Sequence, residues 1–150
     1  MTEPGGIKLF LDRSTNGKRF AEAVKRLFPD TVTIGERYGV AAAEGVPDVD
    51  WIRDATGEGR ICIGSDIRIV SNVLELAAVV ECSARFFLFP NGNMRVAEQI
   101  ARFDGLHDAI VSAAAEPGPW VHKLTAGGLN HTSGEVLVQR LAAARRRAHP

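Results

Sequence analysis

Residues 7–16 read IKLFLDRSTN, and residues 60–66 read RICIGSD. Each stretch is a short apolar run that stops at an aspartate, Asp12 in the first and Asp66 in the second. A short, nearly continuous apolar run that ends in polar residues is typical of a strand buried on both faces of a parallel sheet. The two stretches therefore predict two buried strands, each with a carboxylate at its carboxyl end.

Extended and helical patterns alternate along the rest of the chain. Apolar or β-branched runs predict further strands near 31–34, 85–89 and 120–125. Helical patterns predict helices over 15–28, 48–57, 69–82, 94–103, 106–115 and 134–147, whereas 37–46 is ambiguous and is expected to be a loop. Apolar strands that alternate with helices indicate an α/β domain with a parallel central sheet and helices on both faces.

Length and composition are those of one ordinary globular domain. The chain has 150 residues, of which 45% are hydrophobic and 24% charged. We expect residues 1–6 to be a flexible lead-in and residues 7–150 to be a single domain whose last helix, 134–147, is basic. The 18 Lys and Arg balance 18 Asp and Glu, so no net charge draws the protein to nucleic acid or membrane. Without a secretory leader or an apolar run of about 18 residues, the protein is expected to be cytoplasmic and not membrane-bound.

The aspartates that end the two buried strands are candidate ligand-binding residues. In open parallel sheets ligands bind beyond the carboxyl ends of the strands, and right-handed crossovers place those ends on one edge. We therefore expect Asp12 and Asp66 to be neighbours in space. Asp48, in GVPDVDWIRD (45–54), begins the helix that leads into the second strand, and it joins them if the preceding chain brings that helix to the same edge.

Helix capping is the simpler interpretation of these aspartates. Each one precedes a helix, where an Asp side chain commonly accepts hydrogen bonds from free backbone N–H groups. Capping explains Asp48 and Asp66 as well as ligand binding does, but it explains Asp12 less well, because Ser14 or Thr15 could cap the first helix instead. A convergent set of carboxylates needs a cation to offset the repulsion, and oxygen ligands suit Mg²⁺ or Mn²⁺.

The order of these motifs resembles that of the PIN-like nucleases of the VapC type, the toxins of bacterial toxin–antitoxin pairs. The branch it resembles has a strand that ends in Asp-Arg-Asn, then an Asp-x-x-Trp segment, then a strand that ends in Thr-x-Asp-x-x-Ile. The matching residues are Asp12 and Arg13, Asp48 and Trp51, and Asp66 and Ile69, with Gly64 and Ser65 where the family often has Thr and Lys. The later stretch FPNGNMRVAEQI (89–100) resembles the strand, turn and helix of that branch, and Asn93 takes the place of its Asn.

The resemblance implies a metal-dependent endoribonuclease with a parallel sheet between helices. Asp12, Asp48 and Asp66 would be both the catalytic residues and the ligands of Mg²⁺ or Mn²⁺. RNA would be the substrate, an antitoxin protein would be the cognate partner, and a homodimer is expected by analogy. Hydrolysis of a phosphodiester would use a metal-activated water.

Five further residues are candidates for supporting roles. Asp50 would stand behind the ligands or replace one of them, and Asn93 would supply an oxygen where many PIN nucleases have another acid. Arg13 and Arg68 flank the acids in sequence and would meet the substrate phosphate, unless they pair with the acids themselves. Ser65, next to Asp66, would orient a ligand or a water.

Two other functions compete with this one. The uncharged Asn93 favours a PIN-like domain of weak or lost activity that serves as a binding module. A phosphatase of the haloacid dehalogenase type also begins with a strand that ends in Asp, but its motif resembles Asp-x-Asp-x-Thr, and position 14 here is Ser. Metal-dependent cleavage of RNA separates the nuclease from the binding module.

Overall fold

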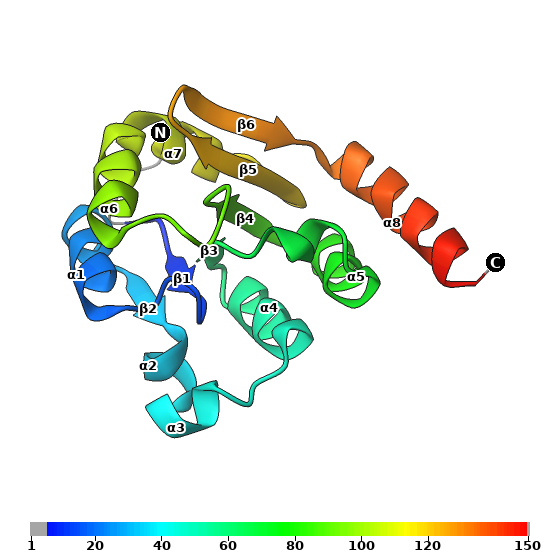
Figure 1. Ribbon diagram of the computed structural model, residues 1–150, viewed down its shortest axis with the longest axis horizontal. Helices are drawn as coiled ribbons and strands as arrows, with labels where there is room; N and C mark the ends of the chain where they lie inside the picture. The colour runs from blue at the N-terminus through cyan, green and yellow to red at the C-terminus, as the bar shows by residue number, and fades with distance from the viewer. Residues whose placement is uncertain (1–5, 150) are drawn as a thin grey trace.

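The computed structural model describes residues 6–149, so residues 1–5 of the expected lead-in, and Pro150, lie outside the described part. Six strands form one sheet (Figure 1). The strands are β1 (Leu9–Leu11), β2 (Thr31–Thr33), β3 (Ile61–Gly64), β4 (Arg85–Leu88), β5 (Trp120–Thr125) and β6 (Gly128–Thr132). Their order across the sheet is β2-β1-β3-β4-β5-β6, and every neighbouring pair is parallel except β5 and β6.

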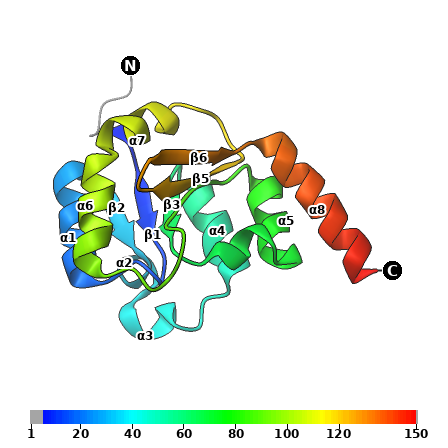
Figure 2. The same ribbon diagram turned by 45° about the horizontal axis from the view of Figure 1, so that its top comes forward.

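Helices cover both faces of this sheet. They are α1 (Lys18–Leu27), α2 (Ile34–Tyr38), α3 (Val40–Ala43), α4 (Asp48–Gly57), α5 (Val73–Cys82), α6 (Val96–Gly105), α7 (His107–Ala114) and α8 (Gly134–Ala148), with a short 3₁₀ helix, η2 (Ile67–Val70). Figure 2 shows α1, α6 and α7 together on one side of the sheet and α4, α5 and α8 on the other. The α/β class and the helices on both faces are confirmed.

Alternate residues of the strands separate two apolar cores. In β1, Leu9 and Leu11 pack towards α1, α6 and α7, where they meet Phe20 and Phe103. Phe10, between them, packs on the other face with residues of α4, α5 and α8. Because strand side chains alternate between faces, a run that is apolar at every position fits a sheet covered on both sides.

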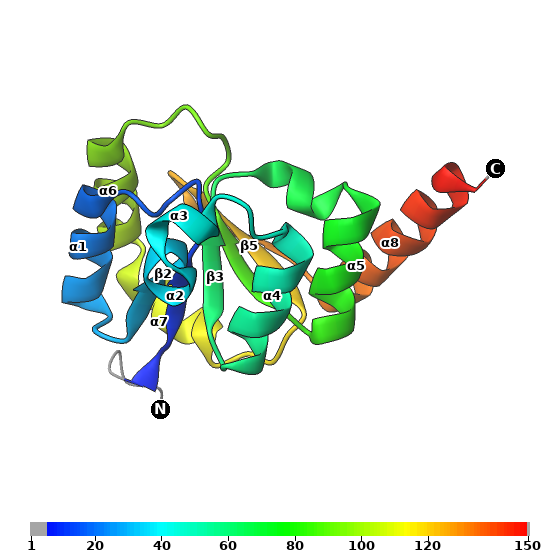
Figure 3. The same ribbon diagram turned by 90° about the horizontal axis from the view of Figure 1, so that it is seen from below.

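The chain reverses its direction across the sheet between β1 and β3. From β1 the chain passes through α1 to β2 on one side, and then returns to β3 on the other side of β1. The amide N–H of Asp12 donates to the carbonyl oxygen of Ile63 at 3.2 Å, which joins the carboxyl ends of the two strands. Figure 3 shows the parallel strands running towards the edge where η2 and the start of α4 lie. This edge is a topological switch point, the usual place for a ligand in an open α/β sheet.

Three expectations about elements differ from the structure. The expected loop 37–46 contains part of α2 and all of α3, because Thr33 and Glu36 form a capping box that starts a helix there. The predicted helix over 69–82 is split into η2 and α5, and Asn72 caps the second piece. The antiparallel β6 was not expected, because its GLNHT sequence is polar and becomes a strand only by pairing with β5. No helix within residues 6–149 combines the length and apolar character needed to cross a bilayer.

Candidate functional site

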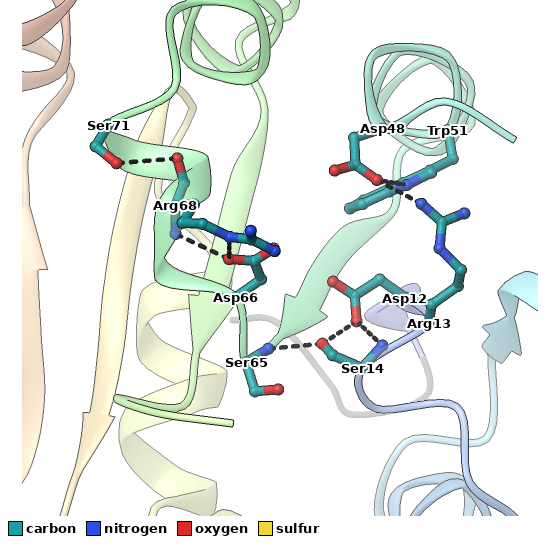
Figure 4. A network of polar contacts seen from close by, with 9 residues as sticks. All are labelled: Asp12, Arg13, Ser14, Asp48, Trp51, Ser65, Asp66, Arg68 and Ser71. Atoms are coloured by element: carbon teal, nitrogen blue, oxygen red, sulfur yellow. Dashed lines mark hydrogen bonds and ion pairs between the residues drawn. The ribbon is translucent and has the colours of Figure 1, made fainter. Parts of the chain in front are cut away.

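A cavity of about 190 Å³ lies at the carboxyl ends of β1 and β3. Its lining consists of Asp12, Arg13, Ser14, Asp48, Trp51, Asp66, Arg68 and Ile69. Figure 4 shows the polar side chains of this group and the hydrogen bonds among them. The structure thus brings the three predicted acids together, although they come from three different elements of the chain.

Asp12 is a buried carboxylate held by hydrogen bonds from the residues that follow it. Its Oδ1 accepts from the amide of Ser14 at 2.9 Å, from the Ser14 hydroxyl at 2.5 Å and from the Thr15 hydroxyl at 3.3 Å. The Ser14 hydroxyl also accepts from the amide of Ser65 at 2.9 Å, which links the two strand ends. Burial raises the pKa of Asp12 to about 6, against the opposing effect of these hydrogen bonds.

Gly64 makes room for the Asp12 carboxylate. A Cβ at position 64 would fall 3.1 Å from Cγ of Asp12 and even closer to its Oδ2. No side chain fits at Gly64 unless Asp12 moves. The motif that this strand resembles often carries Thr here, so the glycine is a departure with a steric reason.

Asp48 is held by two donors and does not cap its helix. The first residue before α4 is Pro47, and no side chain caps this helix. Oδ1 of Asp48 instead accepts from the Arg13 guanidinium at 2.7 Å and from the Trp51 indole N–H at 2.9 Å. The Trp51 ring stacks on Phe10 with centroids 5.5 Å apart. The core of the protein therefore determines where this carboxylate points, and capping by Asp48, the simpler expectation, is wrong.

Arg13 ties the chain before α4 to the site. One of its terminal nitrogens donates to the carbonyl oxygens of Ala43 at 2.9 Å and Val46 at 2.8 Å, while the other bonds Asp48. These contacts bring the start of α4 to the sheet edge, which the sequence did not require. The predicted pairing of Arg13 with an acid is what the structure shows.

Asp66 combines capping with a place in the cavity. Its Oδ1 accepts from the backbone amide of Arg68 at 3.0 Å and so caps η2. The Arg68 guanidinium also binds both carboxylate oxygens at 2.9 Å. This hydrogen bonding lowers the pKa of Asp66 below its usual value. The Arg68 side chain is 83% exposed, so this ion pair lies on the open side of the cavity.

Two of the predicted supporting residues lie outside the cavity lining. Asp50 faces solvent from α4 and pairs with Arg53 at 3.1 Å. Asn93 is exposed in the turn after β4, where its amide donates to the side chain of Asn91. Ser65 is buried beside the site, and its contact there is the backbone amide that binds Ser14.

Glu75, in the first turn of α5, is an acid at this edge that the sequence analysis did not select. Its Oε2 is buried and has no hydrogen-bond partner within the described residues. Burial, and then the nearby carboxylates of Asp48 and Asp66, raise its pKa. The available signal was a lone acid in the apolar run VLELAAVV (73–80), but acids are common in the first turn of any helix.

The donor set suits a hard divalent cation. Four carboxylates, of Asp12, Asp48, Asp66 and Glu75, stand against the two guanidinium groups of Arg13 and Arg68, which leaves two negative charges when all are ionised. Oxygen ligands of this kind are those of Mg²⁺ and Mn²⁺. As the side chains stand, no three acids, histidines or cysteines of residues 6–149 group closely enough to hold one ion. A cation would therefore draw the acids together and displace the exposed Arg68 contact, which costs little.

Comparison with known proteins followed from this geometry. The family model described as PIN like domain matches residues 7–91, which is more than half of the chain and includes all three aspartates of the cavity. VapC45 of Mycobacterium tuberculosis, a provisionally named ribonuclease, is 29% identical over 114 residues, which are 76% of this chain and 83% of that protein. No solved structure matches the chain.

Proposed function

This chain belongs to the PIN-like domain family, and we propose that it is a metal-dependent endoribonuclease that hydrolyses RNA phosphodiesters. The observation that carries the proposal is the single cavity, at the topological switch point, that Asp12, Asp48 and Asp66 line together. The provisional name of the relative in M. tuberculosis supports RNA as the substrate.

Asp12, Asp48 and Asp66 would hold Mg²⁺ or Mn²⁺ in this cavity. When bound, such an ion lowers the pKa of a water molecule and polarises the phosphoryl oxygens. The chain itself supplies the orientation. Ser14 holds Asp12 from one side, and the indole of Trp51 holds Asp48 from the other. Both holding groups are neutral, so they fix the carboxylates without consuming their charge.

Arg68 is the better candidate for the substrate phosphate. Its side chain is 83% exposed and is bound only to Asp66 among the described residues, so it can turn towards a phosphate at small cost. Arg13 has three contacts to hold, on Ala43, Val46 and Asp48, and it would position Asp48. Ser65 would support the site through its amide, while Asp50 and Asn93 have no part in it.

The biological role that we propose is that of the toxin of a toxin–antitoxin pair. A ribonuclease of this kind needs a neutralising antitoxin protein as its partner, and it would meet both RNA and antitoxin in the cytoplasm. Expression of the chain alone should arrest growth, and coexpression of the neighbouring gene should relieve the arrest. Formation of a homodimer stays a prediction, to be checked by light scattering.

Cleavage of a mixed RNA pool with and without Mn²⁺ or Mg²⁺ tests the enzyme. We expect cleavage that EDTA stops and that Asp12→Asn abolishes, with circular dichroism showing that the variant keeps its fold. Equal cleavage by wild type and Asp12→Asn would refute the mechanism. A folded wild type that binds RNA but does not cut it under any metal would favour the alternative, a PIN-like binding module of weak or lost activity.

A further inference from the structure

The carboxylate of Glu75 is the acid of this edge that has no positive partner within residues 6–149. Asp48 is bound by Arg13 and Asp66 by Arg68, whereas Oε2 of Glu75 is buried without a hydrogen bond. A buried polar atom that finds no partner is rare in a folded protein and calls for a ligand or another cause.

Glu75 faces the site and not the solvent side of α5. Its carboxylate lies within hydrogen-bonding reach of the Asp48 side chain and in the field of Asp66. Two ionised carboxylates have no proton to share, which is why this close approach leaves Oε2 without a partner. The placement comes from α5 packing beside α4, whose first residue is Asp48.

We propose that Glu75 is the fourth carboxylate ligand of the divalent cation, an inference that rests on the proposed function. Asn93, which the sequence suggested for this place, lies in an exposed turn away from the cavity lining. A Glu side chain from α5 brings a charge where Asn would bring none. The set of acids at this site would therefore be complete, and the chain need not be a weakened member of its family.

A proton shared between Glu75 and Asp48 would also explain the close approach of the two carboxylates. The two explanations make different predictions. A metal ligand contributes to cation affinity, whereas one partner of a protonated acid pair contributes to stability in the absence of metal. Metal affinity, measured apart from activity, therefore distinguishes them.

Titration calorimetry with Mn²⁺ on wild type, Glu75→Gln, Asp48→Asn and Glu81→Gln tests the proposal. Glu81 is the matched control, because it lies on the same helix but pairs with Arg145 at the surface. We expect Glu75→Gln and Asp48→Asn each to weaken Mn²⁺ binding by about 10-fold or more, and Glu81→Gln to leave it unchanged. If Asp48→Asn weakens binding and Glu75→Gln does not, Glu75 is not a ligand, although the proposed function stands.

Thermal unfolding provides the second measurement. In EDTA we expect Glu75→Gln to melt above wild type, because it removes a carboxylate that repels Asp48 and Asp66, and in Mn²⁺ we expect it to gain a smaller increase in Tm than wild type. A lower Tm in EDTA with an undiminished Mn²⁺ increase would overturn the proposal in favour of a shared proton. Glu75→Ala repeats the comparison should the glutamine disturb folding. Absence of Mn²⁺ binding by wild type itself would refute the proposed function as well.

Discussion

Asp12 combines two requirements that oppose each other. Metal binding needs the ionised carboxylate, but burial at the end of β1 favours the protonated form and raises its pKa to about 6. Hydrogen bonds from Ser14 and Thr15 reduce that cost without removing it. A functional residue that destabilises the metal-free protein at neutral pH is the consequence.

Replacing Asp12 by Asn should therefore stabilise the metal-free protein. The pKa of Asp12 is raised from 3.8 to about 6 on folding, so its contribution to stability is greatest below pH 3.8 and is lost as pH rises through 6. In EDTA at pH 7.5 we expect Asp12→Asn to increase the free energy of unfolding, by up to about 3 kcal/mol, with a smaller gain at pH 5. Urea titrations at both pH values measure this, and a less stable variant at pH 7.5 would show that the buried charge has no such cost.

Gly64 allows a second prediction at the scale of one residue. We expect Gly64→Ala to destabilise the protein by about 1–3 kcal/mol, because the added Cβ meets the Asp12 carboxylate. Mn²⁺ affinity should fall with it. Gly57→Ala is the control, since a Cβ there meets nothing within 4 Å and the helix gains a better helix former. Chemical denaturation of both variants decides, and an unchanged Gly64→Ala would mean that Asp12 can move freely.

Among the elements, the segment from α3 to α4 depends on one side chain. Arg13 bonds the carbonyl oxygens of Ala43 and Val46 and the carboxylate of Asp48, so it connects the end of β1 with the loop and with the first turn of α4. The chain between α3 and α4 has no strand to pair with. Its position at the sheet edge is determined by this residue and by the packing of Trp51.

Removal of Arg13 should loosen this segment. We expect Arg13→Ala to lower the free energy of unfolding by about 1–3 kcal/mol, because two carbonyl oxygens and a carboxylate lose their donor. Amide hydrogen exchange should become faster over 40–50. Arg53→Ala serves as the control, because its exposed pair with Asp50 should contribute less than about 0.5 kcal/mol. Equal exchange in Arg13→Ala and wild type would contradict the anchoring role.

Over the whole molecule, the sheet is parallel where it forms the site and antiparallel only at the far edge. The β5–β6 hairpin pairs His122 with His131, and their rings stack with centroids 4.5 Å apart. Burial, together with the neighbouring His131, lowers the pKa of His122 to about 4. A histidine kept neutral on folding makes the stability of the whole domain sensitive to acid.

We expect the domain to lose stability as pH falls from about 6.5 towards 4. In this range the unfolded chain binds a proton at His122, whose ordinary pKa is 6.5, while the folded chain does not, so acid favours unfolding. His122→Phe should flatten this decline, whereas His149→Gln, at an exposed position near the carboxyl terminus, should not. Tm measured across pH 4–7.5 checks this. An equal slope in His122→Phe and wild type would place the acid sensitivity elsewhere.

Local patterns were sufficient for the sheet and for part of the site. The apolar runs that end at Asp12 and Asp66 predicted two buried strands with acids at one edge, because strand burial and crossover handedness are properties of short stretches. Asp48 entered through the order of motifs. By contrast, the helical pattern around Glu75 was explained equally well by an acid in the first turn of a helix.

From the amino-acid sequence alone came the α/β class, the helices on both faces and the placement of Asp12 and Asp66 at the ends of their strands. Only the tertiary structure decided that Arg13 fastens the start of α4 to that edge, that Gly64 leaves space for Asp12, and that Glu75 faces Asp48 from α5. Periodicity reports which residues of one element are buried. The distance between side chains on different elements depends on how helices pack over the sheet, and no local pattern encodes it.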